Sequence, residues 1–299
     1  MEQLVNLLKE QGPLTGKDLV RETGMDVFRA WKACYSCERI FNRLVSRRYL
    51  RLDKKVEGFA RLSPSIMREF LNYTIIGLKA DIPAMESKAQ KLQQEIAAIS
   101  LRKMQLAEDT VFRVMQEHPD RKIIIECAAF IIAGDVVFNM AHAEPRPELS
   151  TGELVKGSDL DIIIVADNLP EVLLNDIDQI VYREKYNLLI NPALKEELDY
   201  IIKNMDTVRK QLRFDNFKSM VASKILYEGI FLGGSRNLFD HIKSLLKDFA
   251  IDDKIVSFEE KARQDRVVAE KILASDKSTV HDEELMSLFY TTEEKEEIF

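Results

Sequence analysis

The sequence predicts an α+β protein: helices and a hairpin come first, long helices follow, and a mixed sheet with further helices completes the chain. Three observations predict this order. Apolar residues recur at helical spacing near the N-terminus, residues 85–118 are rich in Ala, Leu, Glu, Gln and Lys, and β-branched runs begin at residue 123. The chain has 299 residues, of which 46% are hydrophobic, so it is long enough for about two globular domains.

The first 80 residues predict three helices followed by a hairpin. The apolar residues of 2–10 predict a first helix that ends at Gly12-Pro13, and Thr15 can cap a second short helix. A third helix is expected from Asp26 through Val45, because its apolar residues form one broad stripe. Residues 47–64 contain two short alternating runs that predict a hairpin. Three helices and a hairpin form a winged helix, which we expect in residues 1–80.

This first region is basic. Residues 1–80 contain 15 Lys and Arg against 9 Asp and Glu, a net charge of +6, whereas the remainder carries −13. On the expected third helix and the hairpin, the basic residues that we expect to face nucleic acid are Arg29, Lys32, Arg39, Arg43, Lys54 and Lys55. Such a face can neutralise phosphates of RNA or DNA. The alternative is a solvated face of a module that contacts only protein.

Other classes of protein are disfavoured. Cys34 and Cys37 form a C-x-x-C inside an expected helix, without a second pair or nearby histidines, so we expect structural burial and not a zinc site. No apolar run reaches the ~18–20 residues that cross a bilayer. The opening segment is charged and amphipathic, unlike a signal peptide. We therefore expect a cytoplasmic protein without a membrane partner.

The rest of the chain divides into three expected regions. Residues 81–120 predict a long linker helix, with an arm of a helical hairpin or a dimerising coiled coil, and thus a homodimer, as alternatives. Residues 121–207 predict a mixed sheet, with strands in 123–135 and 159–167 and a helical segment near 169–187. Residues 208–299 predict helices, and Gly233–Arg236 predicts a turn between two of them.

The segment with the clearest chemistry is GSDLDIIIV, residues 157–165. Alternate side chains of a strand point the same way, so Asp159 and Asp161 present two carboxylates on one face while Leu160 and Ile162 enter the core. Two like charges this close repel each other. Two Mg²⁺ (or Mn²⁺) ions about 3.5–4 Å apart can relieve the repulsion by bridging both carboxylates to a triphosphate. The pair therefore indicates metal-assisted phosphoryl transfer.

These residues resemble the nucleotidyltransferase superfamily, which has the DNA polymerase β-like fold. Residues 157–162, GSDLDI, match the family's G-S-D-h-D-h element, and the expected strand FIIAGD places Gly134 at the family's preceding glycine. Asp135 stands where the family has Ser or Gly, and residues 143–156 lengthen the connection between the two elements. The resemblance covers roughly residues 123–235.

The resemblance implies a set of site residues and an NTP substrate. Asp159 and Asp161 would bind the metal as catalytic residues, with Asp199 as a third carboxylate, unless Asp199 is merely an acidic residue at a helix end. Gly134, Asp135, Gly157 and Ser158 would place the triphosphate, although Asp135 can instead cap an expected helix over residues 136–142. Lys218 and Lys224 would reach phosphates, or they are solvated lysines of a helix face.

The resemblance implies transfer of a nucleoside monophosphate from an NTP to a hydroxyl, with release of pyrophosphate. The acceptor would be RNA, a protein side chain or a small molecule, and the basic N-terminal region favours nucleic acid. The alternative is a nucleic-acid-binding regulator, whose second domain senses a nucleotide without catalysis. Asp135 and the lengthened connection favour this alternative.

Overall fold

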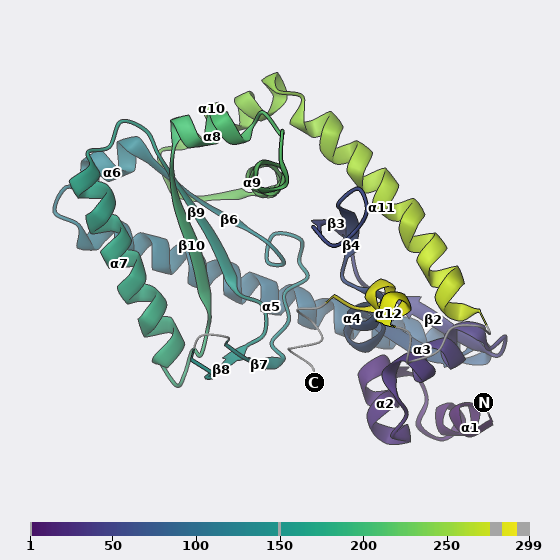
Figure 1. Cartoon of the computed structure of the whole chain (residues 1–299). Coiled ribbons are helices and arrows are strands. Elements are labelled where there is room, and N and C mark those ends of the chain that lie inside the picture. Colours follow the sequence, from purple (N-terminus) through teal and green to yellow (C-terminus); the bar gives the residue numbers. More distant parts are fainter. Residues whose placement is uncertain (1, 149–150, 276–282, 292–299) are drawn as a thin grey trace. The chain divides into compact units, whose positions relative to one another are not determined.

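The computed structural model describes residues 2–148, 151–275 and 283–291 (Figure 1). By compactness the chain divides into two units, one formed by residues 1–95 with 258–299 and the other by residues 96–257. The first unit therefore combines the two ends of the chain. Both units contain helices and small sheets, so the α+β class expected from the sequence is confirmed.

The first unit contains a three-stranded antiparallel sheet of order β1-β5-β2 and a separate hairpin, β3–β4. Its elements are α1 (Glu2–Gln11), β1 (Leu14–Thr15), α2 (Gly16–Thr23), α3 (Val27–Ser36), β2 (Ile40–Leu44), β3 (Tyr49–Leu52), β4 (Ala60–Ser63), α4 (Ile66–Tyr73), β5 (Thr74–Leu78), η1 (Lys79–Asp81), the start of α5 (Ile82–Glu117), the end of α11 (Ile251–Ala274) and α12 (Glu283–Phe289). The hairpin expected in residues 47–64 is confirmed, with Tyr49 opposite Ser63.

The expected third helix is shorter than predicted. The helix begins where expected, with Asp26 as its N-cap, but it ends at Ser36, so its extension to Val45 was wrong. Ile40–Leu44 forms β2 instead and pairs with Leu78–Thr74 of β5. The apolar spacing continues past Ser36, but β-branched and aromatic residues that gain a strand partner satisfy their backbone groups in the sheet. β5 itself was not predicted.

The C-terminal segment completes the core of the first unit. The ring of Phe289 lies 5.2 Å from that of Phe28 and 5.6 Å from that of Trp31. Cys34 and Cys37 are buried free thiols, as expected, and burial raises the pKa of Cys34 to about 12. The C-x-x-C therefore serves packing.

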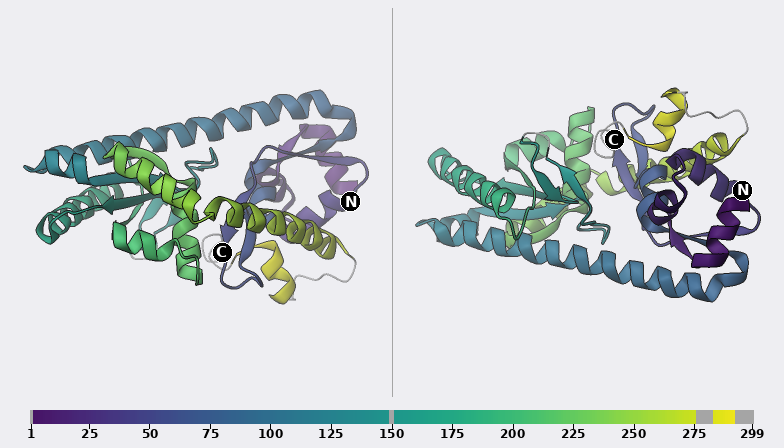
Figure 2. Two further views of the ribbon diagram at one scale, coloured as in Figure 1. Left: turned by 90° about the horizontal axis from the view of Figure 1, so that it is seen from above. Right: turned by 90° about the horizontal axis from the view of Figure 1, so that it is seen from below.

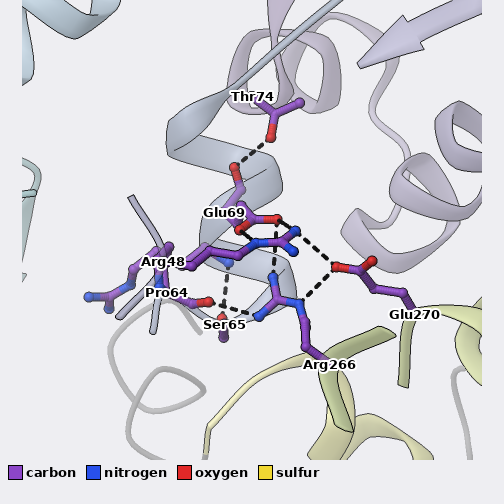
Figure 3. A network of polar contacts seen from close by, with 8 residues as sticks. Arg48, Pro64, Ser65, Glu69, Thr74, Arg266 and Glu270 are labelled. Carbon is purple, nitrogen blue, oxygen red and sulfur yellow. Dashed lines mark hydrogen bonds and ion pairs between the residues drawn. The ribbon is translucent and has the colours of Figure 1, made fainter. Parts of the chain in front are cut away.

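A buried ion network also ties the C-terminal helix to this unit (Figure 3). Arg48 pairs with Glu69 of α4 at 2.6 Å, and Arg266 of α11 pairs with the same carboxylate at 3.1 Å. Glu270 accepts from Arg266 at 2.9 Å and from Arg48 at 3.0 Å. Arg266 also donates to the carbonyl of Pro64 at 2.9 Å. Two carboxylates thus balance two guanidinium groups in the interior.

The second unit is built on a four-stranded sheet of order β10-β9-β6-β11. β10 runs parallel to β9, and the other pairs are antiparallel. Besides parts of α5 and α11, its elements are α6 (Arg121–Cys127), β6 (Ala128–Ala133), β7 (Pro145–Pro147), β8 (Leu154–Lys156), β9 (Leu160–Ala166), α7 (Glu171–Ile190), β10 (Leu198–Asn204), α8 (Met205–Gln211), α9 (Phe217–Glu228), β11 (Ile230–Gly234) and α10 (Arg236–Asp248).

Helices cover both faces of this sheet (Figure 1). α5 and α7 pack on the face that carries Leu160, Ile162 and Ile164, whereas α8 and α9 contact the opposite face. α5 is one unbroken helix in both views of Figure 2, which confirms a helix in the expected linker. Within the described part of the chain, no helix combines the length and the apolar character that a bilayer span requires.

Three expected elements of this unit were wrong. The Ile-rich residues 123–127 belong to α6 and not to a strand, and they bury Ile124 while exposing Ile123 and Ile125. The expected helix over residues 136–142 is replaced by consecutive turns in residues 135–139. Residues 230–234 form β11 instead of a helix and a turn, because they pair with β6.

Candidate functional site

β9 begins at Leu160, so Asp161 lies on this strand and Asp159 directly precedes it. Leu160 and Ile162 are buried in the core beneath α5 and α7, so the side chain of Asp161 lies on the other face of the sheet. Both aspartates are only partly exposed. The two carboxylates lie at the start of β9, close enough for the charge of Asp159 to raise the pKa of Asp161.

Gly134 forms one wall of this site. It follows β6, whose last residue, Ala133, is paired with Asp161. Its φ is +76°, and a Cβ at this position would lie 2.2 Å from Oδ2 of Asp161. Glycine is thus required twice, for its backbone conformation and for the space that the carboxylate occupies.

Negative charge surrounds Asp161. Burial raises its pKa well above the ordinary value, and the charges of Asp159, Asp135, Asp199 and Glu228 raise it further. Burial also raises the pKa of Asp159, whereas the charge of Arg146 lowers it. Arg146, the cation among these causes, acts on Asp159, whereas every group that acts on Asp161 raises its pKa.

The turn that precedes Asp159 is fixed by backbone contacts. Gly157 has φ +62°, and a Cβ there would lie 1.9 Å from the carbonyl oxygen of His142. The same oxygen accepts from the amide of Ser158 at 3.1 Å. The Ser158 hydroxyl donates to Oδ2 of Asp135 at 3.0 Å. Asp135 therefore contacts the motif and does not cap a helix, since residues 135–139 form turns.

Asp199 lies on the neighbouring strand, in register with Asp161. Its side chain is 51% exposed and pairs with Lys185 of α7 at 2.8 Å. Of the two lysines expected near phosphates, Lys218 is exposed, and Lys224 forms an ion pair with Glu228. The structure thus brings Asp199 and Lys224 toward the aspartate pair, each with a partner of opposite charge.

The sequence interpretation missed three charged residues of this region. Glu228 ends α9, and its Oε1 accepts from the amide of Gly134 at 3.4 Å. Arg146 comes from the hairpin β7–β8, which lies in the lengthened connection, and Lys103 comes from α5. A carboxylate directly before Gly229 at a helix end was a weak signal for Glu228. Nothing in the sequence pattern connected Lys103 or Arg146 with the motif.

The donor set suits a hard cation such as Mg²⁺. Among the described residues, no group of three His, Cys, Asp or Glu side chains is arranged to hold a metal ion. Mg²⁺ in phosphoryl-transfer sites is usually bound through one or two carboxylates, with phosphates and water as the other ligands. Asp159 and Asp161 offer such a pair, and a divalent cation would neutralise the like charges that raise the pKa of Asp161. The residues therefore fit the ion in number and chemistry.

The expected basic face is divided between different elements of the first unit. Arg29 and Lys32 lie on α3, where Arg29 is exposed and Lys32 donates to the carbonyl of Ser275 at 2.6 Å. Lys54 and Lys55 are exposed between the hairpin strands.

The other two residues of this face do not lie on α3. Arg39 follows the helix and pairs with Glu2 at 2.6 Å, whereas Arg43 lies on β2 and pairs with Glu86 at 2.7 Å. Only Arg29 and Lys32 therefore share a helix face.

No family model and no curated protein matches this chain. The geometry of the two units is therefore the basis for any functional assignment.

Proposed function

We propose that the second unit is a metal-dependent nucleotidyltransferase, which moves a nucleoside monophosphate from an NTP to a hydroxyl acceptor and releases pyrophosphate. One observation carries the proposal. Asp161 of β9 lies against Gly134, Asp159 directly precedes the strand, and the like charges around Asp161 raise its pKa. Buried like charges without a counter-ion are costly, so such a pair is retained where a cation binds.

In this proposal each residue has a defined role. Asp159 and Asp161 would hold Mg²⁺ or Mn²⁺, which when bound would polarise the α-phosphate and lower the pKa of the attacking hydroxyl. Asp199, in register with Asp161, would supply a third carboxylate after its ion pair with Lys185 opens. The backbone of Gly134 and the turn at Gly157-Ser158 would place the triphosphate. Lys224 neutralises Glu228 beside this site.

The first unit would bring the acceptor. Residues 1–80 carry a net charge of +6, and their three helices and hairpin support a winged helix that contacts RNA or DNA through α3 and the hairpin. Arg29, Lys54 and Lys55 are exposed in the described structure. Arg39 and Arg43 pair with glutamates, which reduces their expected contribution.

One observation favours a second candidate, a nucleic-acid-binding regulator without catalysis. Asp135 accepts from the Ser158 hydroxyl at 3.0 Å, so a carboxylate occupies the place where the family's serine or glycine would meet a phosphate. Its charge would repel the triphosphate unless a cation lay between them. Nucleotide sensing tolerates weak binding of this kind, whereas catalysis requires the phosphates to be held in line.

The experiment incubates the chain with Mg²⁺ and each α-³²P-labelled NTP, and then adds total RNA. The proposal expects transfer of label that Asp159→Asn and Asp161→Asn abolish, while Asp206→Asn retains it. Asp206 is a matched control, because it is an aspartate of the same unit whose side chain is 79% exposed on α8. If the chain binds a nucleotide but transfers no label from any of the four NTPs, with either Mg²⁺ or Mn²⁺, the result would support the nucleic-acid-binding regulator instead.

A further inference from the structure

Two buried cations hold the backbone of the turn that carries Asp159. Lys103 of α5 donates to the carbonyl of Lys156 at 2.8 Å and pairs with Glu196. Arg146 of β7 donates from Nε to the carbonyl of Gly157 at 2.8 Å. The carbonyls of two consecutive residues, Lys156 and Gly157, thus accept hydrogen bonds from Lys103 and Arg146.

The partners of these cations are also successive residues. Nη2 of Arg146 lies 2.8 Å from Oε2 of Glu197, and the two side chains are 14% and 12% exposed. The backbone of this glutamate segment holds the motif as well, because the amide of Leu160 donates to the carbonyl of Glu197 at 2.9 Å. Arg146 therefore joins the hairpin, the turn and the start of β10 through one planar group.

We propose that Arg146 is a positioning residue: its guanidinium fixes the turn Gly157–Asp159 so that the Asp159 carboxylate stands beside Asp161 for a divalent cation. This inference rests on the proposed function. A guanidinium suits the role because its rigid plane presents nitrogens in two fixed directions; here Nε donates to the Gly157 carbonyl while Nη2 forms an ion pair with Glu197. A lysine keeps the charge but cannot reproduce both directions.

Positioning and bare charge predict opposite effects on cation binding. If Arg146 acted only through its positive charge, removing it would tighten the binding of a cation at Asp159. If it positions the turn, removing it displaces a ligand and weakens binding. A purely structural role would lower the free energy of unfolding and leave the affinity of the folded protein unchanged.

The first test titrates Mn²⁺ into the full chain, alone and with a non-hydrolysable ATP analogue, and follows free Mn²⁺ by electron paramagnetic resonance. We expect Arg146→Met to weaken binding by about tenfold, the lower end of the range for residues that support metal ligands. Arg146→Lys should restore part of the affinity. Arg113→Met is the matched control, since Arg113 pairs with Glu184 at 2.8 Å between α5 and α7, on the opposite face of the sheet. Unchanged or tighter binding by Arg146→Met overturns the inference.

The second test needs no metal. Hydrogen exchange of the Ser158 and Leu160 amides should accelerate in Arg146→Met and, to a smaller extent, in Arg146→Lys, while amides of α9 keep their wild-type rates. Wild-type rates at both amides would overturn the inference. If the wild-type chain binds no Mn²⁺, with or without nucleotide, the proposed function fails, and the exchange rates alone then decide whether Arg146 positions the turn.

Discussion

Gly134→Ala should disturb the candidate site through a single methyl group. The substitution places a Cβ at φ +76°, which costs about 1–2 kcal/mol for a non-glycine residue. The Cβ would also lie 2.2 Å from Oδ2 of Asp161, so that side chain must rotate away from its position. An off-rotamer side chain costs about 0.5–1.5 kcal/mol. The expected loss in the free energy of unfolding is therefore ~1.5–3.5 kcal/mol, together with weaker Mn²⁺ binding.

Gly152→Ala is the matched control for this prediction. Gly152 lies in the same unit with φ +71°, but a Cβ there meets no atom within 4 Å, so it should cost only the backbone term of about 1–2 kcal/mol. Urea unfolding of both variants isolates the contact with Asp161. In an Asp161→Ala background the excess cost of Gly134→Ala should disappear, because the methyl group no longer meets a carboxylate. Equal costs for the two glycines, or an excess that persists without Asp161, would refute the placement of this carboxylate.

Three further predictions concern other parts of the chain. Arg266→Ala should lower the free energy of unfolding by about 3–5 kcal/mol, because it leaves the buried carboxylates of Glu69 and Glu270 with one guanidinium, that of Arg48. Arg263→Ala on the same helix should cost less than about 1 kcal/mol, since its side chain is 55% exposed whereas that of Arg266 is 6% exposed; equal losses in urea unfolding would contradict this. Burial lowers the pKa of Lys243 to about 8, so between pH 8 and about 10.5 the unfolded chain binds a proton that the folded chain has lost. The free energy of unfolding of the wild type should therefore rise with pH over this window relative to that of Lys243→Met. A difference between the two proteins that does not change with pH would contradict the lowered pKa. If the first unit binds nucleic acid, Arg29→Ala should reduce the salt dependence of the association constant by about one ion, and Arg43→Ala, whose guanidinium pairs with Glu86, should change it less; the reverse order would point to β2 as the contact.

Local patterns in the sequence predicted those elements whose signal is contained in neighbouring residues. The cap at Thr15, the hairpin around Lys54 and the alternation of Asp161 with Leu160 and Ile162 depend on side chains a few positions apart, and all three are present. The length of α5 followed from composition in the same way. Such features need no knowledge of the tertiary fold.

Elements that depend on distant partners were missed for a physical reason. β2, β5 and β11 are strands because they pair with one another or with β6, and the pairing partner lies 30 or more residues away in the chain. Isoleucine-rich residues 123–127 carry high strand propensity, but they form a helix with one buried position, Ile124. The charged groups around the aspartates, Arg146 and Glu228, also come from separate elements, so no spacing rule connects them.

The electrostatics of the aspartate pair constrain what the second unit can do. Folding brings Asp159, Asp161, Asp135 and Glu228 together, whereas Arg146 and Lys224 offset the charge of only Asp159 and Glu228. Asp161 is left with the cost of burial and of repulsion by like charges. Replacing it with Asn, a neutral residue of the same shape, would remove both costs. A chain that carries aspartate there accepts a less stable fold, and binding of a cation would return the lost free energy. A thermal shift with Mn²⁺ that is larger for wild type than for Asp161→Asn is the direct consequence of this argument, and equal shifts would mean that the charge at Asp161 has no such counter-ion.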